Sequence, residues 1–169
     1  MKMRRSLQLG SPPPSAANRT DGQKRELPVQ AGALPWRCNV KGRMEVLLIT
    51  SRSSGRWIIP KGQPMADKTL AQAAAIEAFE EAGVEGEISH EALGEFEHEK
   101  RHWLTGPVRY RIVVHALAVH RELATWPEQT ERKRIWLAPE EAASIVRSEQ
   151  LAALLRRLRA KERRLTRSR

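Results

Sequence analysis

The sequence has one cysteine, one tyrosine and two phenylalanines among 169 residues, and it has no long apolar run. The single cysteine, Cys38, excludes an intramolecular disulfide and favours a reducing compartment. No apolar stretch approaches the ~20 residues that a membrane-spanning helix needs. The basic N-terminal end is not followed by the apolar stretch of a secretory signal. We therefore expect a cytoplasmic protein that makes no contact with a membrane.

Acidic residues are also scarce, with 20 Asp and Glu against 30 Lys and Arg, so the net charge is +10. The excess lies at the two ends. Residues 1–26 carry six basic and two acidic residues, and residues 151–169 carry eight basic residues and one acidic residue, which leaves −1 for the rest. Basic ends can bind polyanions without specificity, and they can equally serve solubility. We expect any contact with nucleic acid to go through these ends alone.

The chain is long enough for one domain with a sizeable core. Residues 1–26 contain GSPPPSAANRTDGQ, which is rich in Pro, Ser, Gly and Asn and has little apolar surface to bury. This composition predicts a disordered basic tail. A single domain is predicted over residues 27–164, including a C-terminal helix, and a second basic tail over residues 165–169.

Apolar patterning predicts strands, then a helix, then strands and then two helices. Pro35 interrupts the first strand, which predicts an edge or a bulge there. Apolar residues on both faces predict that 108–120 is a central strand. The predicted strands are 29–37, 44–50, 56–60, 93–100, 108–120 and 132–137. This order predicts an α+β fold with a mixed sheet covered by helices.

The alanine-rich stretch between Thr69 and Gly83 predicts a helix over 70–82. Thr69 can cap its start, with Gln72 as the partner in a capping box. Gly83 is a natural residue to end it. So many alanines on one side predict that this helix packs closely against a sheet.

Three glutamates, Glu77, Glu80 and Glu81, fall within an arc of about 100° on this helix. Like-charge pairs at helical spacing destabilise an isolated helix by roughly 0.2–0.5 kcal/mol each. Either this face is simply solvated, or a bound cation offsets the repulsion. Hard divalent cations such as Mg²⁺ take oxygen ligands, and carboxylates one helical turn apart can converge on one.

The stretch that carries these glutamates resembles the Nudix box, G-x5-E-x7-R-E-U-x-E-E-x-G-U, where U is a bulky aliphatic residue. The positions that agree with the pattern are Gly62, Glu77, Glu80, Glu81, Gly83 and Val84, with Ala78 in the first U slot. The absence of a side chain at Gly62 permits a close approach between the loop and the helix.

Two positions depart from the Nudix pattern. Lys68 stands where the pattern has Glu, which removes an accessory acid. Ile76 stands where the pattern has Arg, which removes a cation that would pair with carboxylates and hold the loop against the helix. Ile76 can instead bury apolar surface. The departures leave three outcomes open: a slower site, weaker metal binding or an inactive site.

The segment RKRIWLAPEEA, residues 132–142, is similar to a segment of the diphosphoinositol polyphosphate phosphohydrolase branch of this family. The resemblance implies an α/β/α sandwich and a hydrolase that cleaves a diphosphate linkage in a nucleoside or inositol polyphosphate. It also implies Mg²⁺ or Mn²⁺ as cofactor and a small polyphosphate molecule as partner. The alternative is a catalytically weak or inactive Nudix module that binds nucleotide or RNA.

The resemblance further implies roles for the carboxylates of the box. Glu77 and Glu81 resemble the metal-binding carboxylates. Glu80 resembles a metal-site carboxylate or proton acceptor, and which of the three is the catalytic base stays open. The backbone carbonyl of Lys61 is a further candidate metal ligand.

Cationic side chains outside the box recur on predicted strand ends and loops, and each alone is equally a solvated charge. Three of them match positions where the inositol-phosphate branch places phosphate contacts: Arg56, Arg132 and Arg134. Guanidinium groups suit this role because their planar fork binds phosphate through two hydrogen bonds. We therefore expect these three arginines to bind substrate.

Overall fold

The computed structural model describes residues 26–102, 104 and 106–167. The tail predicted over 1–26 falls outside these residues except for Glu26. Within the described part of the chain, no helix combines the length and the apolar character that crossing a membrane requires.

One sheet and three helices make up the described fold, which confirms the predicted α+β class. The strands are β1 (Val29–Cys38), β2 (Met44–Thr50), β3 (Trp57–Ile58), β4 (Lys61–Gly62), β5 (Val84–His102), β6 (Gly106–Glu122) and β7 (Arg134–Leu137). The helices are α1 (Leu70–Ala82), α2 (Pro139–Ile145) and α3 (Glu149–Arg167). α3 continues beyond Arg164, where the predicted domain ended.

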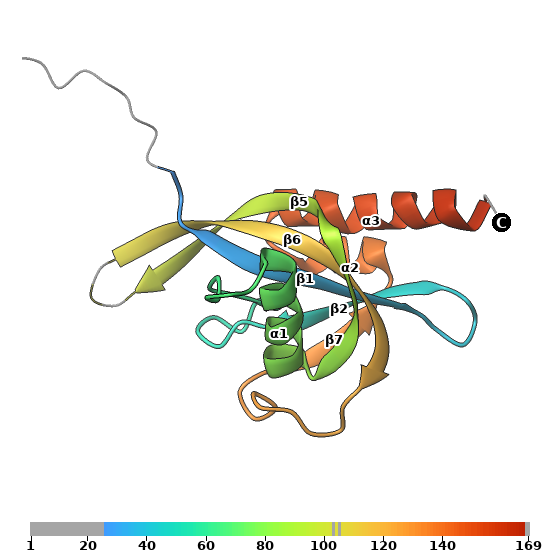
Figure 1. The fold of residues 1–169 in the computed structure, drawn as a ribbon, viewed down its shortest axis with the longest axis horizontal. Coiled ribbons are helices and arrows are strands. Elements are labelled where there is room, and N and C mark those ends of the chain that lie inside the picture. Colours follow the sequence, from blue (N-terminus) through green and yellow to red (C-terminus); the bar gives the residue numbers. More distant parts are fainter. Residues whose placement is uncertain (1–25, 103, 105, 168–169) are drawn as a thin grey trace, which may run out of the picture.

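The sheet is mixed, with the strand order β3-β2-β1-β6-β5, while β4 pairs with β1 and β7 pairs with β2. β1 runs parallel to β6 and antiparallel to β2 and β4. α1 lies in front of the sheet in Figure 1, and α2 and α3 lie behind it. The helices therefore flank the sheet as the predicted α/β/α sandwich requires.

Of the two alternatives predicted from Pro35, an edge strand or a bulge, the edge strand is wrong. β1 lies between β6 on one side and β4 and β2 on the other. Pro35 falls between Ala33, whose N–H donates to the Pro60 carbonyl, and Trp36, the first residue that pairs with β2. Proline lacks an N–H, and this costs least at a point where the strand changes partners.

β5 begins at Val84, directly after α1, and not at residue 93 as predicted. Its pairing with β6 is irregular between Glu85 and Gly86 and again between Ile88 and Gly94. Bulges of this kind break the apolar alternation by which a strand is recognised in a sequence. The prediction that β6 is central is confirmed, because β6 lies between β1 and β5.

Local chemistry fixes both ends of α1, which matches the predicted helix residue for residue. The Thr69 hydroxyl accepts the Gln72 N–H at 3.2 Å, and the Gln72 side chain accepts the Thr69 N–H at 2.9 Å. Gly83 ends the helix in the left-handed region, with φ 63°. The predicted capping box and C-terminal glycine are thus confirmed.

Alanines let α1 lie close to the sheet. They face β1, which presents the small residues Ala31 and Ala33 to the core. Phe79 departs from this pattern, because this large apolar side chain of α1 is 36% exposed. The buried alanines of α1 are Ala71, Ala73, Ala74, Ala78 and Ala82.

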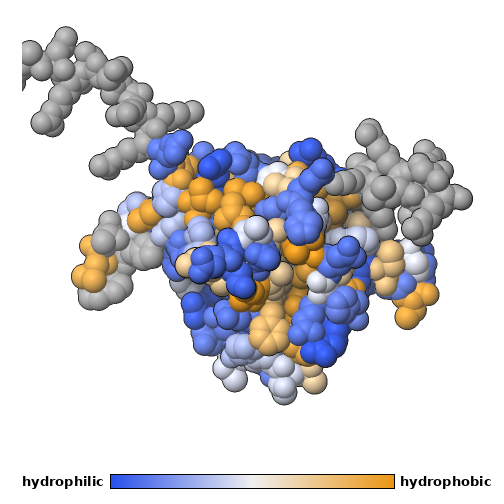
Figure 2. Space-filling view, viewed as in Figure 1, coloured by the Kyte–Doolittle hydropathy of each residue, from blue (hydrophilic) through white to orange (hydrophobic). Residues whose placement is uncertain are grey.

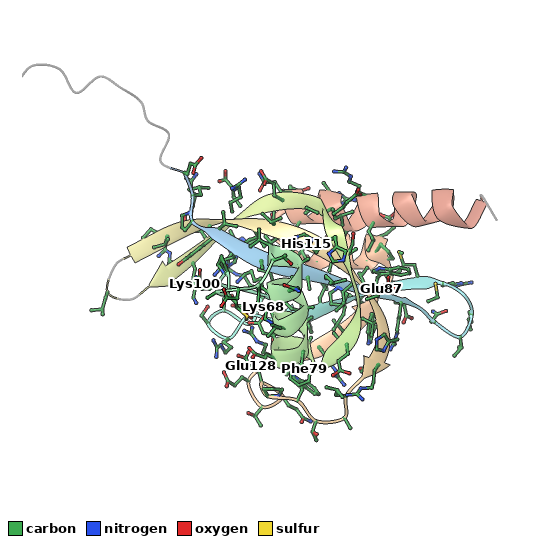
Figure 3. All side chains as sticks on the ribbon, viewed as in Figure 1. Lys68, Phe79, Glu87, Lys100, His115 and Glu128 are labelled. Carbon is green, nitrogen blue, oxygen red and sulfur yellow. The ribbon has the colours of Figure 1, made fainter. Side chains whose placement is uncertain are left out.

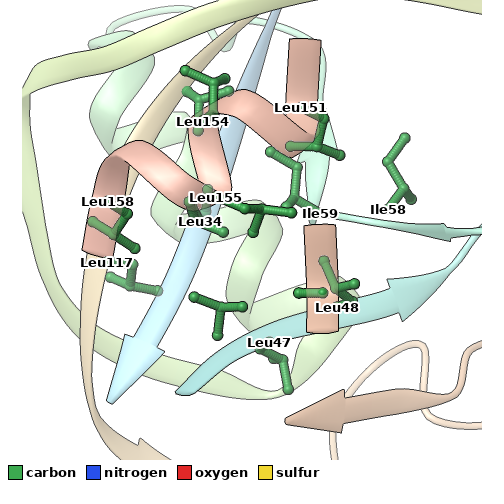
Figure 4. Packing of buried hydrophobic residues seen from close by; sticks show 14 of the residues in the cluster. Leu34, Leu47, Leu48, Ile58, Ile59, Leu117, Leu151, Leu154, Leu155 and Leu158 are labelled. Carbon is green, nitrogen blue, oxygen red and sulfur yellow. The ribbon is translucent and has the colours of Figure 1, made fainter. Parts of the chain in front are cut away.

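α3 covers the sheet with a stripe of four leucines. Figure 4 shows Leu151, Leu154, Leu155 and Leu158 close to core residues of the strands, and all four are buried. The packing is tight, because a Cβ added at Gly94 of β5 would lie 2.5 Å from Leu154. Figure 2 shows that hydrophilic side chains interrupt the apolar ones over the visible face of the molecule.

Replacing Gly83 with alanine should destabilise the protein for two reasons. Gly83 has φ 63°, and an added Cβ would lie 2.7 Å from the Trp126 ring. Gly55 is the matched control, since it has φ 64° but no atom within 4 Å of an added Cβ. We expect Gly55→Ala to lower the free energy of unfolding by about 1–2 kcal/mol, and Gly83→Ala to lower it further. Urea unfolding measures both, and equal losses would show that the Trp126 contact is unimportant.

Candidate active site

A cavity of about 1330 Å³ opens beside the C-terminal half of α1. Residues of α1, β4 and β5 line it, together with the segments before β7 and α3, so the lining runs from Gln30 to Leu151 along the chain. In Figure 3, Lys100 and Glu128, which both line the cavity, lie on one side of α1, and Glu87 lies on the other.

All three glutamates of the predicted motif line this cavity. They differ in exposure: Glu80 is exposed, Glu77 is half-buried and Glu81 is only 7% exposed. A simply solvated face would leave all three in water. The burial of Glu81 therefore excludes that explanation.

Gly62 provides the room for Glu77. Gly62 lies in the short strand β4, where it pairs with Ala31 of β1. A Cβ added at Gly62 would overlap the carboxylate of Glu77. Glycine is required here by space, because the carboxylate lies directly against the backbone of β4.

Hydrogen bonds hold both oxygens of the Glu81 carboxylate. The N–H of Lys61 donates to Oε2 at 3.0 Å, and the guanidinium of Arg132 binds Oε1. Arg132 also donates from Nε to Glu128 at 2.5 Å and from Nη1 to the Thr50 carbonyl at 3.0 Å. Glu81 is thus tied to β4 and to the segment before β7.

Burial raises the pKa values of two of these carboxylates, and repulsion between the carboxylates adds to the shift. Burial raises the pKa of Glu77 to about 7, and the charges of Glu81, Glu80 and Glu128 add to the effect. Burial also raises the pKa of Glu81, although Arg132 opposes the shift. The attraction of Arg132 therefore does not outweigh the cost of burying the Glu81 charge.

Cationic groups line other parts of the same cavity. Burial lowers the pKa of His98 to about 4, with the charges of Lys61 and Lys100 adding to the shift, so this imidazole is neutral near pH 7. Burial also lowers the pKa of Lys61. The remaining basic residues of the lining are Arg52, Arg56, Arg101, Arg132 and Arg147. The cavity therefore presents both carboxylates and cations to a ligand.

The predicted phosphate-binding arginines lie in two places. Arg56 and Arg132 line the cavity. Arg134 does not line it, because it donates to the carbonyls of Ala82 at 2.7 Å and Leu123 at 2.8 Å. Arg134 thus binds the end of α1, and the structure does not bring it together with the other two.

Sequence reasoning missed the cations that serve α1. The C-terminal end of a helix is its negative end, yet α1 has no basic residue in its last turn and carries Glu80 and Glu81 there. Arg132, in the segment before β7, and Arg134, the first residue of β7, supply the missing positive charge. The lack of a Lys or Arg in the last turn was the signal that could have linked this segment to the helix.

Neither of the two departures from the motif lines the cavity. Lys68 is exposed and does not line the cavity. Ile76 is half-buried and does not join the apolar side chains that pack against the core, so its expected burial is only partial.

The donor chemistry fits a hard divalent cation. Among the described residues, no three His, Cys, Asp or Glu side chains already stand in an arrangement that could hold an ion. A bound ion would therefore have to draw the carboxylates together. Carboxylate oxygens are suitable ligands for Mg²⁺, and a cation beside Glu77 would relieve the repulsion from Glu81 and Glu80 that adds to the effect of burial on its pKa.

A family model for the NUDIX domain matches residues 28–160, so this chain belongs to the Nudix family. The chain is 35% identical over 122 residues to Nudix hydrolase 13, mitochondrial, of Arabidopsis thaliana, covering 68% of this chain and 59% of that protein. It is also 35% identical over 105 residues to diphosphoinositol polyphosphate phosphohydrolase 2 of Rattus norvegicus, covering 60% of this chain and 54% of the relative. The chain thus spans little more than half the length of these relatives.

Solved structures share the fold. The crystal structure of the C. elegans Ap4A hydrolase superposes with a TM-score of 0.57 at 22% identity, covering 80% of this chain and 98% of that one. The resemblance to the Nudix family and the predicted fold class are therefore confirmed. The cytoplasmic location stays a prediction.

Gly62→Ala should weaken metal binding, because the added methyl group displaces the carboxylate of Glu77. We expect it to lower the affinity for Mn²⁺ about tenfold or more, as Glu77→Gln should, in line with the cost of disturbing groups around a metal site. Titration calorimetry without substrate measures this, with Gly55→Ala as control. Binding of Mn²⁺ by Gly62→Ala as tight as by the parent would contradict the role of this contact.

Proposed function

We propose that this chain is a divalent-metal-dependent hydrolase that cleaves a diphosphate linkage in a nucleoside or inositol polyphosphate. One observation carries the proposal: a single cavity brings together Glu77, Glu80 and Glu81 with cations such as Arg56 and Lys100. Carboxylates alone would repel a polyphosphate, and cations alone would bind it without activating it. The combination suits a substrate that is bound through phosphates and cleaved beside a metal ion.

The different surroundings of the three carboxylates suit them to different roles. Glu77 and Glu81 would hold the Mg²⁺ or Mn²⁺, with the carbonyl of Lys61 as a further ligand. The ion would act as a Lewis acid toward the diphosphate oxygens. Glu80 is the most exposed of the three and is reached by water, so it is the first candidate to accept a proton from the attacking water, and Glu77 is the second.

The cations of the cavity suit the substrate's phosphates. Arg56 is exposed, so its guanidinium can reach a ligand, while Lys100 and Arg101 extend the positive surface along β5. A cavity of about 1330 Å³ is large for a small-molecule site. It leaves room for a chain of phosphates and the group that they are attached to. The names of the rat relative and the C. elegans structure point to inositol and dinucleoside polyphosphates as the classes to test.

Glu80→Gln should abolish most of the activity. In a panel of inositol and dinucleoside polyphosphates, the parent should release phosphate or a nucleotide only with Mg²⁺ or Mn²⁺, and a chelator should stop the reaction. Removing a catalytic base typically lowers the rate by about 10²–10⁴-fold. Glu87→Gln is the control, since Glu87 is exposed and lies on the other side of α1 (Figure 3). A parent that hydrolyses nothing in the panel would overturn the proposal.

Arg56→Ala should raise KM for a phosphate-rich substrate more than it lowers kcat. A hydrogen bond to a charged group contributes about 1.5–3 kcal/mol, so we expect an increase in KM of about tenfold or more. Lys41→Ala is the control, because Lys41 is exposed and lies outside this cavity. Equal KM values for Arg56→Ala and the parent would remove Arg56 from the substrate site.

A second candidate function rests on Lys68 and Ile76, which depart from the family pattern. In this alternative the chain is a weak or inactive Nudix module that binds nucleotide or RNA, with the basic residues of 1–26 and 165–169 as tails. Nucleotide binding without turnover in the panel would favour it. Removal of the tails should then weaken binding most at low salt.

A further inference from the structure

Glu81 is a buried carboxylate at the negative end of a helix. It is 7% exposed, and α1 offers it no Lys or Arg in its last turn. A buried charge is strongly unfavourable unless it is paired and hydrogen-bonded. Its partners come from elsewhere in the chain: the N–H of Lys61 and the guanidinium of Arg132.

Arg132 is fixed more firmly than a phosphate-binding side chain at a surface. Its side chain is 8% exposed. Three different groups hold its guanidinium, namely Glu81, Glu128 and the Thr50 carbonyl. Glu128 is itself anchored, because its N–H donates to the Glu80 carbonyl at 3.1 Å. Because the guanidinium is planar and rigid, these three partners fix its orientation.

We propose that Arg132 is a positioning residue that holds the Glu81 carboxylate in the orientation needed for metal binding. Each carboxylate oxygen has two acceptor sites. Arg132 takes one site on Oε1 and the Lys61 N–H takes one on Oε2, so each oxygen keeps a site for a cation. Arg132 thereby provides, from the segment before β7, the fixed cation that the family pattern places at position 76, where this chain has Ile76.

This inference rests on the proposed metal-dependent function and assigns Arg132 a task other than the predicted phosphate contact. Groups that orient a metal ligand typically change metal affinity or activity by about 10–100-fold when they are removed. A direct phosphate contact would instead change KM for the substrate and leave metal affinity unchanged. The two roles therefore differ in an experiment without substrate.

The experiment is a calorimetric titration of the full chain with Mn²⁺, without substrate. Arg132→Ala should weaken Mn²⁺ binding about 10–100-fold, and Arg132→Lys should restore part of the loss because it keeps the charge. The double variant Arg132→Ala/Glu81→Gln should bind no more weakly than Glu81→Gln, because Arg132 acts through Glu81. Arg121→Ala is the matched control, since Arg121 forms an exposed ion pair with Glu85 at 2.7 Å away from the cavity.

Three results would overturn the inference: parental Mn²⁺ affinity in Arg132→Ala, losses that add fully in the double variant, or a change confined to KM. If Arg132→Ala does not fold, Arg132→Lys and the double variant carry the test, because the double variant removes the buried charge together with its partner. A parent that binds Mn²⁺ through Arg132 but hydrolyses nothing would refute the proposed function alone. A parent that hydrolyses substrate with Mn²⁺ affinity indifferent to Arg132 would refute this inference alone.

Discussion

Negative charge at the C-terminal end of α1 is the constraint on which the arrangement of the site depends. The helix dipole makes this end negative, and Glu80 and Glu81 add to it within the last turn. Burying Glu81 makes the cost larger. Arg132 pairs with the charge of the Glu81 side chain. Arg134 donates to the carbonyl of Ala82, one of the last carbonyls of α1 that have no partner within the helix.

The connection between β6 and β7 is organised around that end of the helix. The Leu123 N–H donates to the Gly83 carbonyl at 2.8 Å. The Trp126 ring lies against Gly83, with the Arg134 guanidinium 3.9 Å from its centroid. The Leu123 backbone, the Trp126 ring and the Arg134 guanidinium thus all contact the C-terminal end of α1. The connection has no regular secondary structure, but it acts as the C-terminal cap of α1 and delivers Arg132 to Glu81.

Features encoded by neighbouring residues were predictable, and features that depend on distant partners were not. Both ends of α1 and the grouping of its glutamates follow from Thr69, Gly83 and helical periodicity. The place of Pro35 in a central strand could not be predicted, because it depends on where β1 exchanges β4 for β2. The pairing of Arg132 with Glu81 spans 51 residues of sequence. From the sequence alone, the position of Arg132 in a basic cluster was equally consistent with a residue that binds phosphate.

The parallel pairing of β1 with β6 has a consequence for how the protein folds. β1 pairs with residues 111–118 on one side, so that side of β1 has no partner until most of the chain has been made. The cavity is lined by residues as far along as Leu151. Closing such long loops is entropically costly and slow compared with forming local structure. No N-terminal fragment that ends before Leu151 contains the whole lining. We therefore expect full affinity for ions and phosphates to appear only late in synthesis.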